Sequence, residues 1–428
     1  MNIDIVASLL FIPILIVSID VLTQFRSHFT SINYYPVTSA TEPCTDFTII
    51  VPIYGHISYL ENVDYLHCYG ERVLLTTSNM ETGTFYEALQ HIARQHGFRV
   101  HVSSRLPSPA ERDRDGRGQR ATGGTLRDTI VLDAHQSISS RYVVCIDADT
   151  VTDVSLDYLV GALKEAQLDM ASVILTAANR DTLLERLQGH EYRMAMRIRR
   201  IMPWMISGGC HLGKREVHRD LMENHSLFFQ GNDVEIGILA NLKKYRIGHI
   251  PFIVPTTVPS TLRGWSRQRT AWAGGEFRLM IINFRVAWRH PFLYLYGGVI
   301  VIILLPMRWY YVSHPTWTLA TVLFLYFVVV LMVNWRTRDW ALLVYPFYSL
   351  FYTLVMVPVG IFSYVEMAIK YRNMGVIGVH RGKHRMRYGR TPSFLGARVG
   401  RLTGLERPEI LDSVREEFEM PDPADRPG

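Results

Sequence analysis

A long apolar run near the C-terminal end of the chain is the feature that most constrains its fold. Residues 341–369 carry a single carboxylate, Glu366. As one α-helix this run would be about 44 Å long, because each residue adds about 1.5 Å. A bilayer core is about 30 Å thick, so the run is too long for one upright crossing and too short for two. Pro346 and Pro358 offer break points, which favours an interfacial piece followed by one membrane crossing.

Other apolar runs flank a middle segment with the charge density of a soluble protein. Residues 5–19 read as a retained membrane anchor or as a cleaved signal peptide, and the absence of a basic segment before them favours the anchor. Residues 317–333 predict another crossing, and residues 292–305 form a shorter candidate. The number of C-terminal crossings, and with it the side of the tail, stays open.

These patterns predict an integral protein of the plasma membrane whose middle domain is cytoplasmic. The expected parts are a transmembrane anchor (1–30), the middle domain (45–257), amphipathic interface helices (258–290), a C-terminal transmembrane region (291–371) and a tail that is first basic and then acidic (372–428).

Charge and cysteine usage exclude several classes of function. The net charge is +6, and arginines cluster just after the last apolar run, where they suit an anionic lipid surface. We therefore expect a lipid bilayer as partner and no nucleic acid. Cys44, Cys68, Cys145 and Cys210 show no metal-ligand spacing, which fits a reducing compartment and argues against a zinc site or a disulfide framework.

The middle segment alternates between short apolar runs and amphipathic stretches, as an α/β fold requires. Strands are expected at residues 47–51, 72–75, 99–102 and 141–146, and helices at residues 81–96 and 126–135. Gly97 is placed to cap the first helix. The pattern predicts an α/β domain with a mostly parallel sheet, joined to transmembrane helices.

Residues 111–125 are rich in glycine and arginine and contain few apolar side chains. They fit a mobile, solvated loop. The alternative, which composition favours less, is a loop that closes over a polyphosphate, because glycine lets backbone amides approach and arginine offers forked donors.

Two aspartates, Asp147 and Asp149, directly follow the most strand-like segment of the chain. Ligand sites of parallel sheets form beyond the carboxyl ends of the strands. Two desolvated carboxylates are costly without a partner, and a hard divalent cation, Mg²⁺ or Mn²⁺, would relieve them. The alternative is that Asp149 or Thr150 merely caps the next helix.

Three further motifs follow in order: Ser207-Gly208-Gly209, Gly231-Asn232-Asp233 and Gln268-Arg269-Thr270-Ala271-Trp272. Together with V-P-I-Y and D-A-D they resemble the processive members of glycosyltransferase family 2, such as hyaluronan, chitin and cellulose synthases. The resemblance runs from about residue 47 to residue 272 and continues into the apolar region. It implies a GT-A-like nucleotide-sugar-binding domain.

For the donor side, the resemblance implies that Pro52 and Tyr54 line the nucleotide base. Arg120 stands where the family usually has a phosphate-facing lysine. Asp147 and Asp149 would hold the metal and the diphosphate of the nucleotide sugar.

For the acceptor side, the resemblance implies that Gly208 and Gly209 border the acceptor and that Asp233 is the general base. The last motif would bracket the diphosphate and the acceptor sugar through Gln268, Arg269 and Trp272.

Departures from the family pattern bear on donor choice and activity. Where the family has an aspartate after the second strand, this chain has threonines, so hydroxyl groups of Thr76 and Thr77 would contact the nucleotide. Asn232 replaces the usual glutamate beside the base. Ala271 takes the position of the motif's final arginine, so Arg269 or Arg267 would have to neutralise the leaving phosphates.

These residues predict a membrane-bound inverting glycosyltransferase that moves a sugar from a nucleotide sugar, with UDP as the expected nucleotide, to a growing polysaccharide, with coupled export as a further expectation. Transfer to a lipid-linked acceptor is an alternative, and a catalytically impaired membrane scaffold is another. The sugar and the oligomeric state are not predicted.

Overall fold

The computed structural model describes residues 33–104, 125–199, 202–225, 232–282 and 334–370, and short pieces between 320 and 332. The expected anchor (1–30), the apolar candidate 292–305, most of the candidate 317–333, residues 105–124 and the tail (372–428) lie outside the described residues.

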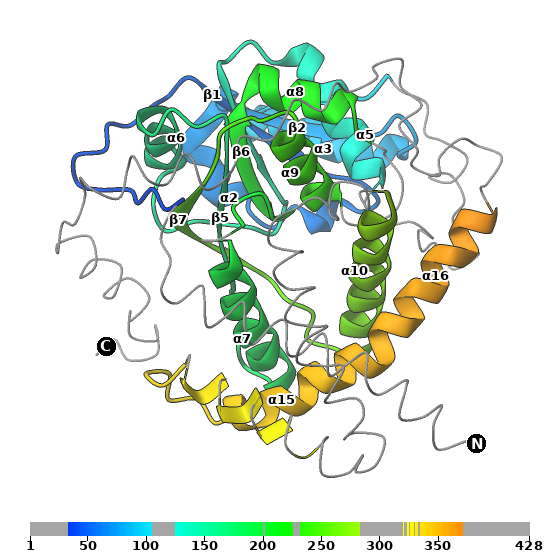
Figure 1. Cartoon of the computed structure of the whole chain (residues 1–428). Helices are drawn as coiled ribbons and strands as arrows, with labels where there is room; N and C mark the ends of the chain where they lie inside the picture. The colour runs from blue at the N-terminus through cyan, green and yellow to red at the C-terminus, as the bar shows by residue number, and fades with distance from the viewer. Residues whose placement is uncertain are drawn as a thin grey trace. The chain divides into compact units, whose positions relative to one another are not determined.

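A seven-stranded mixed sheet forms the centre of the α/β domain, in the order β3-β2-β1-β4-β6-β5-β7 (Figure 1). Its strands are β1 (Phe47–Pro52), β2 (Val73–Thr77), β3 (Arg99–Val102), β4 (Tyr142–Ile146), β5 (Met170–Ala177), β6 (Cys210–Lys214) and β7 (Ile247–Thr256). The pairs β2/β3, β1/β2, β1/β4 and β5/β7 are parallel. The prediction of a mostly parallel sheet is confirmed.

Strand β6 runs antiparallel to both of its neighbours, β4 and β5. Its first residue, Cys210, pairs with Ile146, the last residue of β4. The segment before β6 therefore lies at the same edge of the sheet as the segment after β4. This one reversed strand brings Gly208 and Gly209 beside Asp147.

The helices of the domain are α2 (Val63–Leu66), α3 (Gly83–His96), α5 (Thr125–Ala134), α6 (Leu156–Glu165), α7 (Leu183–Ile198), α8 (Arg215–Glu223), α9 (Asn232–Leu242) and α10 (Leu262–Ile282), with 3₁₀ turns η1 (Ile57–Tyr59), η2 (His67–Arg72) and η3 (His135–Ser137). Helix α3 begins after the capping residue Thr82, and Gly97 ends it at a φ of 71°. The predicted Gly97 cap is confirmed.

Both faces of the central strands are covered, as the apolar runs of β1 and β4 require. On one face, Ile50, Leu74 and Cys145 belong to a core with side chains of α5, α8 and α9. Phe47 packs edge to face on Tyr69 of η2. The strands are thus fixed from both sides, which gives their carboxyl ends a rigid position.

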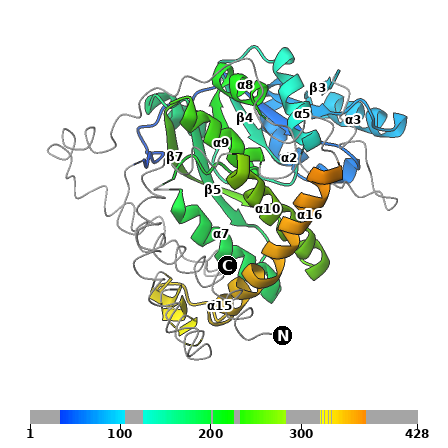
Figure 2. The ribbon, with the colours of Figure 1, turned by 45° about the vertical axis from the view of Figure 1, so that its right-hand side comes forward.

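Helices α7 and α10 follow the strands β5 and β7 and lead from the sheet to the apolar helices α15 (Ala341–Phe351) and α16 (Val357–Lys370) (Figures 1 and 2). A second apolar core joins them, with Leu187 from α7, Trp265 from α10 and Tyr345 from α15. Glycine allows close contact between α10 and α16: a Cβ at Gly360 would lie 2.6 Å from the carbonyl oxygen of Thr270.

Among the described residues, one helix is long and apolar enough to cross a membrane, Ala341–Ile369, with 28% of its most apolar window buried. Pro346 and Pro358 predict a break in this helix, but the helix does not break at either residue. Instead a π-helical turn, η5 (Tyr352–Met356), lies between α15 and α16. The wider turn precedes Pro358 and accommodates the missing backbone donor without interrupting the helix.

One side of this long helix is an exposed apolar stripe. Its members recur every three or four residues, which is the spacing of one helix face. They are Leu343, Phe347, Phe351, Val355, Val359, Phe362, Val365 and Ile369.

Candidate active site

The turn after β4 carries Asp147 and Asp149, and backbone contacts hold it on two sides. The amide of Asp147 donates to the carbonyl of Gly209 over 3.0 Å. The buried side chain of Asn62 donates to the carbonyls of Asp147 (3.0 Å) and Thr150 (2.8 Å). The turn is therefore preorganised by backbone groups and by the Asn62 amide, without the use of its two carboxylates.

Arg127 of α5 is the residue that ties the turn to the S-G-G segment. Its Nε and Nη2 donate to Oδ1 of Asp147 over 3.0 and 2.8 Å, and Nη2 also donates to the carbonyl of Gly208 over 2.6 Å. The Arg127 side chain is 14% exposed and that of Asp147 is 37% exposed. The carboxylate thus opens toward solvent while its counter-ion lies behind it.

Asp233, at the start of α9, lies against Gly208. A Cβ at Gly208 would be 3.4 Å from Asp233 Oδ2. Burial raises the pKa of Asp233, and the positive charge of Arg127 opposes this rise. The residue is half-buried. Asp233 thus lies against the glycine whose carbonyl Arg127 joins to Asp147.

Asp149 has the properties of a carboxylate that needs a cation. Burial, together with the negative charge of Asp147, raises the pKa of Asp149 to about 6. Its Oδ1 accepts a hydrogen bond from the Thr150 hydroxyl over 3.0 Å. No cluster of three or more His, Cys, Asp or Glu side chains that could hold a metal occurs in the described part of the chain. A metal here would take its remaining ligands from water or phosphate, which suits Mg²⁺ and Mn²⁺.

The predicted donor-side residues meet at the carboxyl ends of β1 and β2. Pro52 pairs with Thr76 in the sheet, and Tyr54 is half-buried two residues beyond Pro52. Thr76 and Thr77 are fully buried, and the Thr76 hydroxyl donates to the carbonyl of Ile130 over 3.2 Å. The Thr76 hydroxyl therefore contacts α5, and a contact of Thr76 or Thr77 with the nucleotide stays a prediction. Arg120 lies outside the described residues.

The Arg269 guanidinium is fully buried on α10 and pairs with a carboxylate of α7. Its Nε and Nη2 donate to Oε2 of Glu191 over 3.2 and 2.6 Å, and Nη1 donates to Gln268 over 2.6 Å. Tyr348 of α15 donates to the same Glu191 oxygen over 2.6 Å. The segment thus joins the sheet domain to the apolar helices. A contact between Arg269 and the diphosphate stays a prediction.

Trp272 lies on the same helix with its ring half-buried. The ring stacks on Tyr192 with centroids 6.2 Å apart, and the Arg269 guanidinium carbon lies 4.2 Å from the Trp272 centroid. Arg267, the other candidate partner for phosphates, is exposed. Stacking of Trp272 on an acceptor sugar would use only the ring surface that these contacts leave free.

A buried histidine chain supports the S-G-G segment from behind. His135 Nε2 lies 2.7 Å from His218 Nδ1, His218 Nε2 lies 3.0 Å from His211 Nε2, and His211 Nδ1 lies 3.3 Å from the carbonyl of Ser207. Burial lowers the pKa of His135 to about 4 and that of His211 to about 3, so the chain is neutral at pH 7.

The Ser207 carbonyl determines the tautomer of every ring in this chain. A carbonyl only accepts, so His211 donates through Nδ1 and accepts at Nε2. His218 must then donate through Nε2 and accept at Nδ1, and His135 must donate through Nε2. The chain therefore ends on the backbone next to Gly208, where it positions the glycine that Arg127 and Asp233 contact.

Two charged residues near Asp233 complete the site. Arg199 is buried at the end of α7, and burial lowers its pKa to about 10, while the charge of Asp233 opposes that shift. Asp128 is 1% exposed, its two oxygens accept no hydrogen bond from the described residues, and its Oδ1 lies 3.6 Å from Arg127 Nη1. Burial raises the pKa of Asp128 to about 6.

Sequence reasoning missed Arg127, Asp128, Asn62, Glu191 and Arg199. A signal existed for the first two, because Arg127 and Asp128 are adjacent charged residues in a helix that continues with mostly apolar side chains, so they require partners. Asn62 lies in an irregular segment and shows no pattern. Glu191 and Arg199 look like ordinary polar positions of an amphipathic helix.

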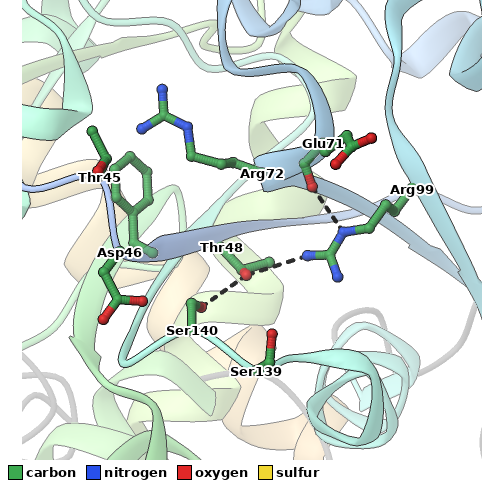
Figure 3. Close-up of a pocket in the computed structure, with 9 residues that line it drawn as sticks. Thr45, Asp46, Thr48, Glu71, Arg72, Arg99, Ser139 and Ser140 are labelled. Carbon is green, nitrogen blue, oxygen red and sulfur yellow. Dashed lines mark hydrogen bonds between the residues drawn. The ribbon is translucent and has the colours of Figure 1, made fainter.

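A shallow pocket of about 360 Å³ lies at the opposite, amino-terminal edge of the strands (Figure 3). Figure 3 shows Arg99 bound to the carbonyl of Glu71 and to Thr48, which in turn contacts Ser140. These polar groups bind one another, and the pocket shares no residue with the site around Asp147. It is therefore a separate surface feature. The lining residues are Thr45, Asp46, Phe47, Thr48, Glu71, Arg72, Arg99, Ser139 and Ser140.

Solved structures similar to this chain are distant from it in sequence. The mannosyltransferase PcManGT from Pyrobaculum calidifontis, in complex with GDP-Man and Mn²⁺, is 14% identical over 86% of this chain and 97% of its own, with a TM-score of 0.48. Glucosyl-3-phosphoglycerate synthase from Mycobacterium tuberculosis, solved with Mn²⁺, UDP and phosphoglyceric acid, is 14% identical over 53% of this chain and 76% of its own, with a TM-score of 0.34.

Comparison with families is more informative. No curated protein matches the chain significantly. The family model for glycosyl transferase family group 2 matches residues 142–364, from the strand that leads into Asp147 to the apolar helix α16. Because this match spans more than half of the chain, the protein belongs to glycosyl transferase family group 2 and is a glycosyltransferase.

Proposed function

We propose that this glycosyltransferase is an inverting enzyme of the membrane surface that uses a nucleotide sugar and a divalent cation at Asp147 and Asp149. The observation that carries the proposal is that Arg127 and Gly208 connect Asp147 to Asp233. Arg127 binds the Asp147 carboxylate and the Gly208 carbonyl, and a Cβ at Gly208 would lie 3.4 Å from Asp233 Oδ2. Because Gly208 has no side chain, the proposed base lies against the segment that Arg127 joins to the proposed metal ligand.

The donor set fits Mg²⁺ or Mn²⁺. Two carboxylates close enough to raise the pKa of Asp149 are stabilised by a divalent charge, and both are oxygen ligands that these ions prefer. When bound, such an ion neutralises charge on the leaving diphosphate. Asp147 and Asp149 would hold it from the strand-end turn that Asn62 and Gly209 position.

Asp233 is proposed as the general base. It accepts the proton of an acceptor hydroxyl while that oxygen forms a bond to the anomeric carbon and the bond from that carbon to the diphosphate breaks. Burial raises the pKa of Asp233, and the positive charges of Arg127 and Arg199 oppose that rise. One displacement inverts the configuration of the anomeric carbon.

The acceptor is proposed to be a growing polysaccharide at the surface of the plasma membrane. Support comes from the exposed apolar stripe on the helix Ala341–Ile369 and from the packing of α10. Trp265 of α10 belongs to the apolar core that α7 and the apolar helix share, and α10 also contacts the apolar helix at Gly360. Trp272, proposed to contact the acceptor, and the contact with the apolar helix thus belong to one element, α10. Transfer to a lipid-linked acceptor has the same support and is kept as the second candidate.

Mass analysis of products tests the proposal. Purified protein would be incubated with a panel of UDP-sugars and GDP-sugars, with and without Mn²⁺, and with membrane lipid as acceptor. We expect sugar transfer from one donor that stops on addition of a chelator. A ladder of products indicates a polymer, and a single addition indicates a lipid-linked acceptor. Absence of both transfer and Mn²⁺-dependent donor hydrolysis would show a catalytically impaired scaffold.

A further inference from the structure

Arg127 occupies the carboxylate that the proposed function assigns to the metal. We propose that Arg127 competes with the divalent cation for Asp147 and passes to the diphosphate when cation and nucleotide bind together. The inference rests on the proposed function, because it takes Asp147 as a metal ligand. It makes Arg127 a residue that determines both metal affinity and leaving-group binding.

The competition follows from the geometry. Two N–H groups of Arg127 bind one oxygen, Oδ1 of Asp147, at 3.0 and 2.8 Å. A divalent cation that approaches this carboxylate meets a monovalent cation already seated on it. The guanidinium and a divalent cation on the same carboxylate would repel each other. The repulsion is strong because the Arg127 side chain is 14% exposed and poorly screened.

The Arg127 guanidinium lies near a second carboxylate, that of Asp128. Its Nη1 lies 3.6 Å from Oδ1 of Asp128, which belongs to the same helix and accepts no hydrogen bond from the described residues. A shift toward Asp128 would release Asp147 without leaving the buried cation unpaired. The negative charge of Asp128 therefore makes the exchange accessible.

A diphosphate would complete the exchange, because the planar fork of arginine matches phosphate oxygens. Metal and nucleotide then each raise the affinity of the site for the other, because the metal displaces Arg127 from Asp147 and the diphosphate binds the displaced guanidinium. By linkage, the nucleotide must raise the metal affinity by the same factor as the metal raises the nucleotide affinity. The metal alone should bind weakly.

Binding of Mn²⁺ to the full-length protein in detergent tests this, with free Mn²⁺ measured by electron paramagnetic resonance. Without nucleotide, Arg127→Gln should bind Mn²⁺ about tenfold more tightly than the wild type, within the range of coupled sites. With saturating UDP or GDP the difference should shrink. Arg127→Lys, which keeps the charge and guards against misfolding of the Gln variant, should stay close to the wild type.

Arg72→Gln is the matched control, since Arg72 pairs with Asp157 over 2.5 Å outside the site and its loss should not change Mn²⁺ binding. Unchanged or weaker Mn²⁺ binding by Arg127→Gln, beside a wild type that binds, would overturn the competition and leave the metal site intact. If no protein binds Mn²⁺ even with UDP or GDP, the metal site of the proposed function is itself wrong.

Discussion

At the scale of single residues, the buried side chain of Asp128 lowers the stability of the folded protein when it is ionised. Burial raises the pKa of Asp128 from 3.8 to about 6 in the folded protein. Between about pH 4 and pH 6 the folded state therefore holds a proton that the unfolded state has released. Stability contributed by the protonated group is present at the acidic end of this window and is lost as the pH rises through it.

Asp128→Asn should remove this loss. We expect the variant to be about 1–3 kcal/mol more stable than the wild type at pH 7 and equal to it near pH 4, because a shift of one pKa unit corresponds to about 1.4 kcal/mol. Thermal unfolding of both proteins across this pH range measures the difference. A stability difference that does not depend on pH would show that Asp128 does not titrate there.

The histidine chain makes a second prediction for a single residue. His218→Leu would leave the donor of His135 and the acceptor of His211 unpaired in the interior. Each lost partner costs about 1–3 kcal/mol, so we expect a clear fall in thermal stability. His91→Leu, at an exposed position of α3, is the control that should change little. Equal stability of the two variants would contradict the assigned tautomers.

At the scale of elements, the contact of α10 with α16 depends on Gly360. A side chain there would meet the Thr270 carbonyl, Ala273 and the Gly274 amide at 2.6 to 2.7 Å. Gly360→Leu should therefore separate the two helices, at a cost of about 1–3 kcal/mol or more from overpacking.

Thermal unfolding in detergent, together with sugar transfer, measures this effect. Both should fall in Gly360→Leu, because α10 also carries Arg269 and Trp272. Gly83→Ala is the control, since a Cβ at Gly83 meets nothing within 4 Å. Wild-type stability of the Leu variant would show that the two helices are not packed as described.

Local patterns predict much of the fold but not the reversal of β6. The strands at β1, β3 and β4 and the capped helix α3 follow from apolar runs and capping residues. Strand β6 contains a histidine, a glycine and a lysine, so its alternation is weak. Its direction depends on pairing with β4 and β5, which are distant in the chain, and no local pattern encodes that pairing.

The candidate site likewise contains residues that sequence motifs predict and residues that they do not predict. Asp147, Gly208 and Asp233 form recognisable motifs, and the structure brings them together. Asn62 acts through contacts with residues far away in the sequence, so no local pattern reveals it. For Arg127 the sequence indicates a charge that requires a partner, but it does not identify that partner as Asp147. For Arg269, the motif implied a phosphate contact, whereas the structure shows an ion pair with Glu191, a partner that only the packing of α7 on α10 supplies.

At the scale of the whole molecule, the apolar stripe predicts contact with lipid. A nitroxide label at Phe362→Cys, a position 71% exposed, should be more accessible to oxygen than to a polar nickel complex after reconstitution. Tyr59→Cys, at a position 60% exposed on the catalytic domain, should show the reverse. Cys68, the exposed cysteine of the described residues, would first be replaced by Ser. Polar-reagent access at both labels would contradict a membrane location.

The proposed mechanism depends most on Asp233 as the base, next to the Gly208 segment that Arg127 joins to Asp147. Sugar transfer by Asp233→Asn, measured with purified protein beside binding of the donor nucleotide, tests it most directly. Loss of the base should lower transfer by about a hundredfold or more while nucleotide binding stays within a few-fold of the wild type. Wild-type turnover by Asp233→Asn would contradict the assignment of the base.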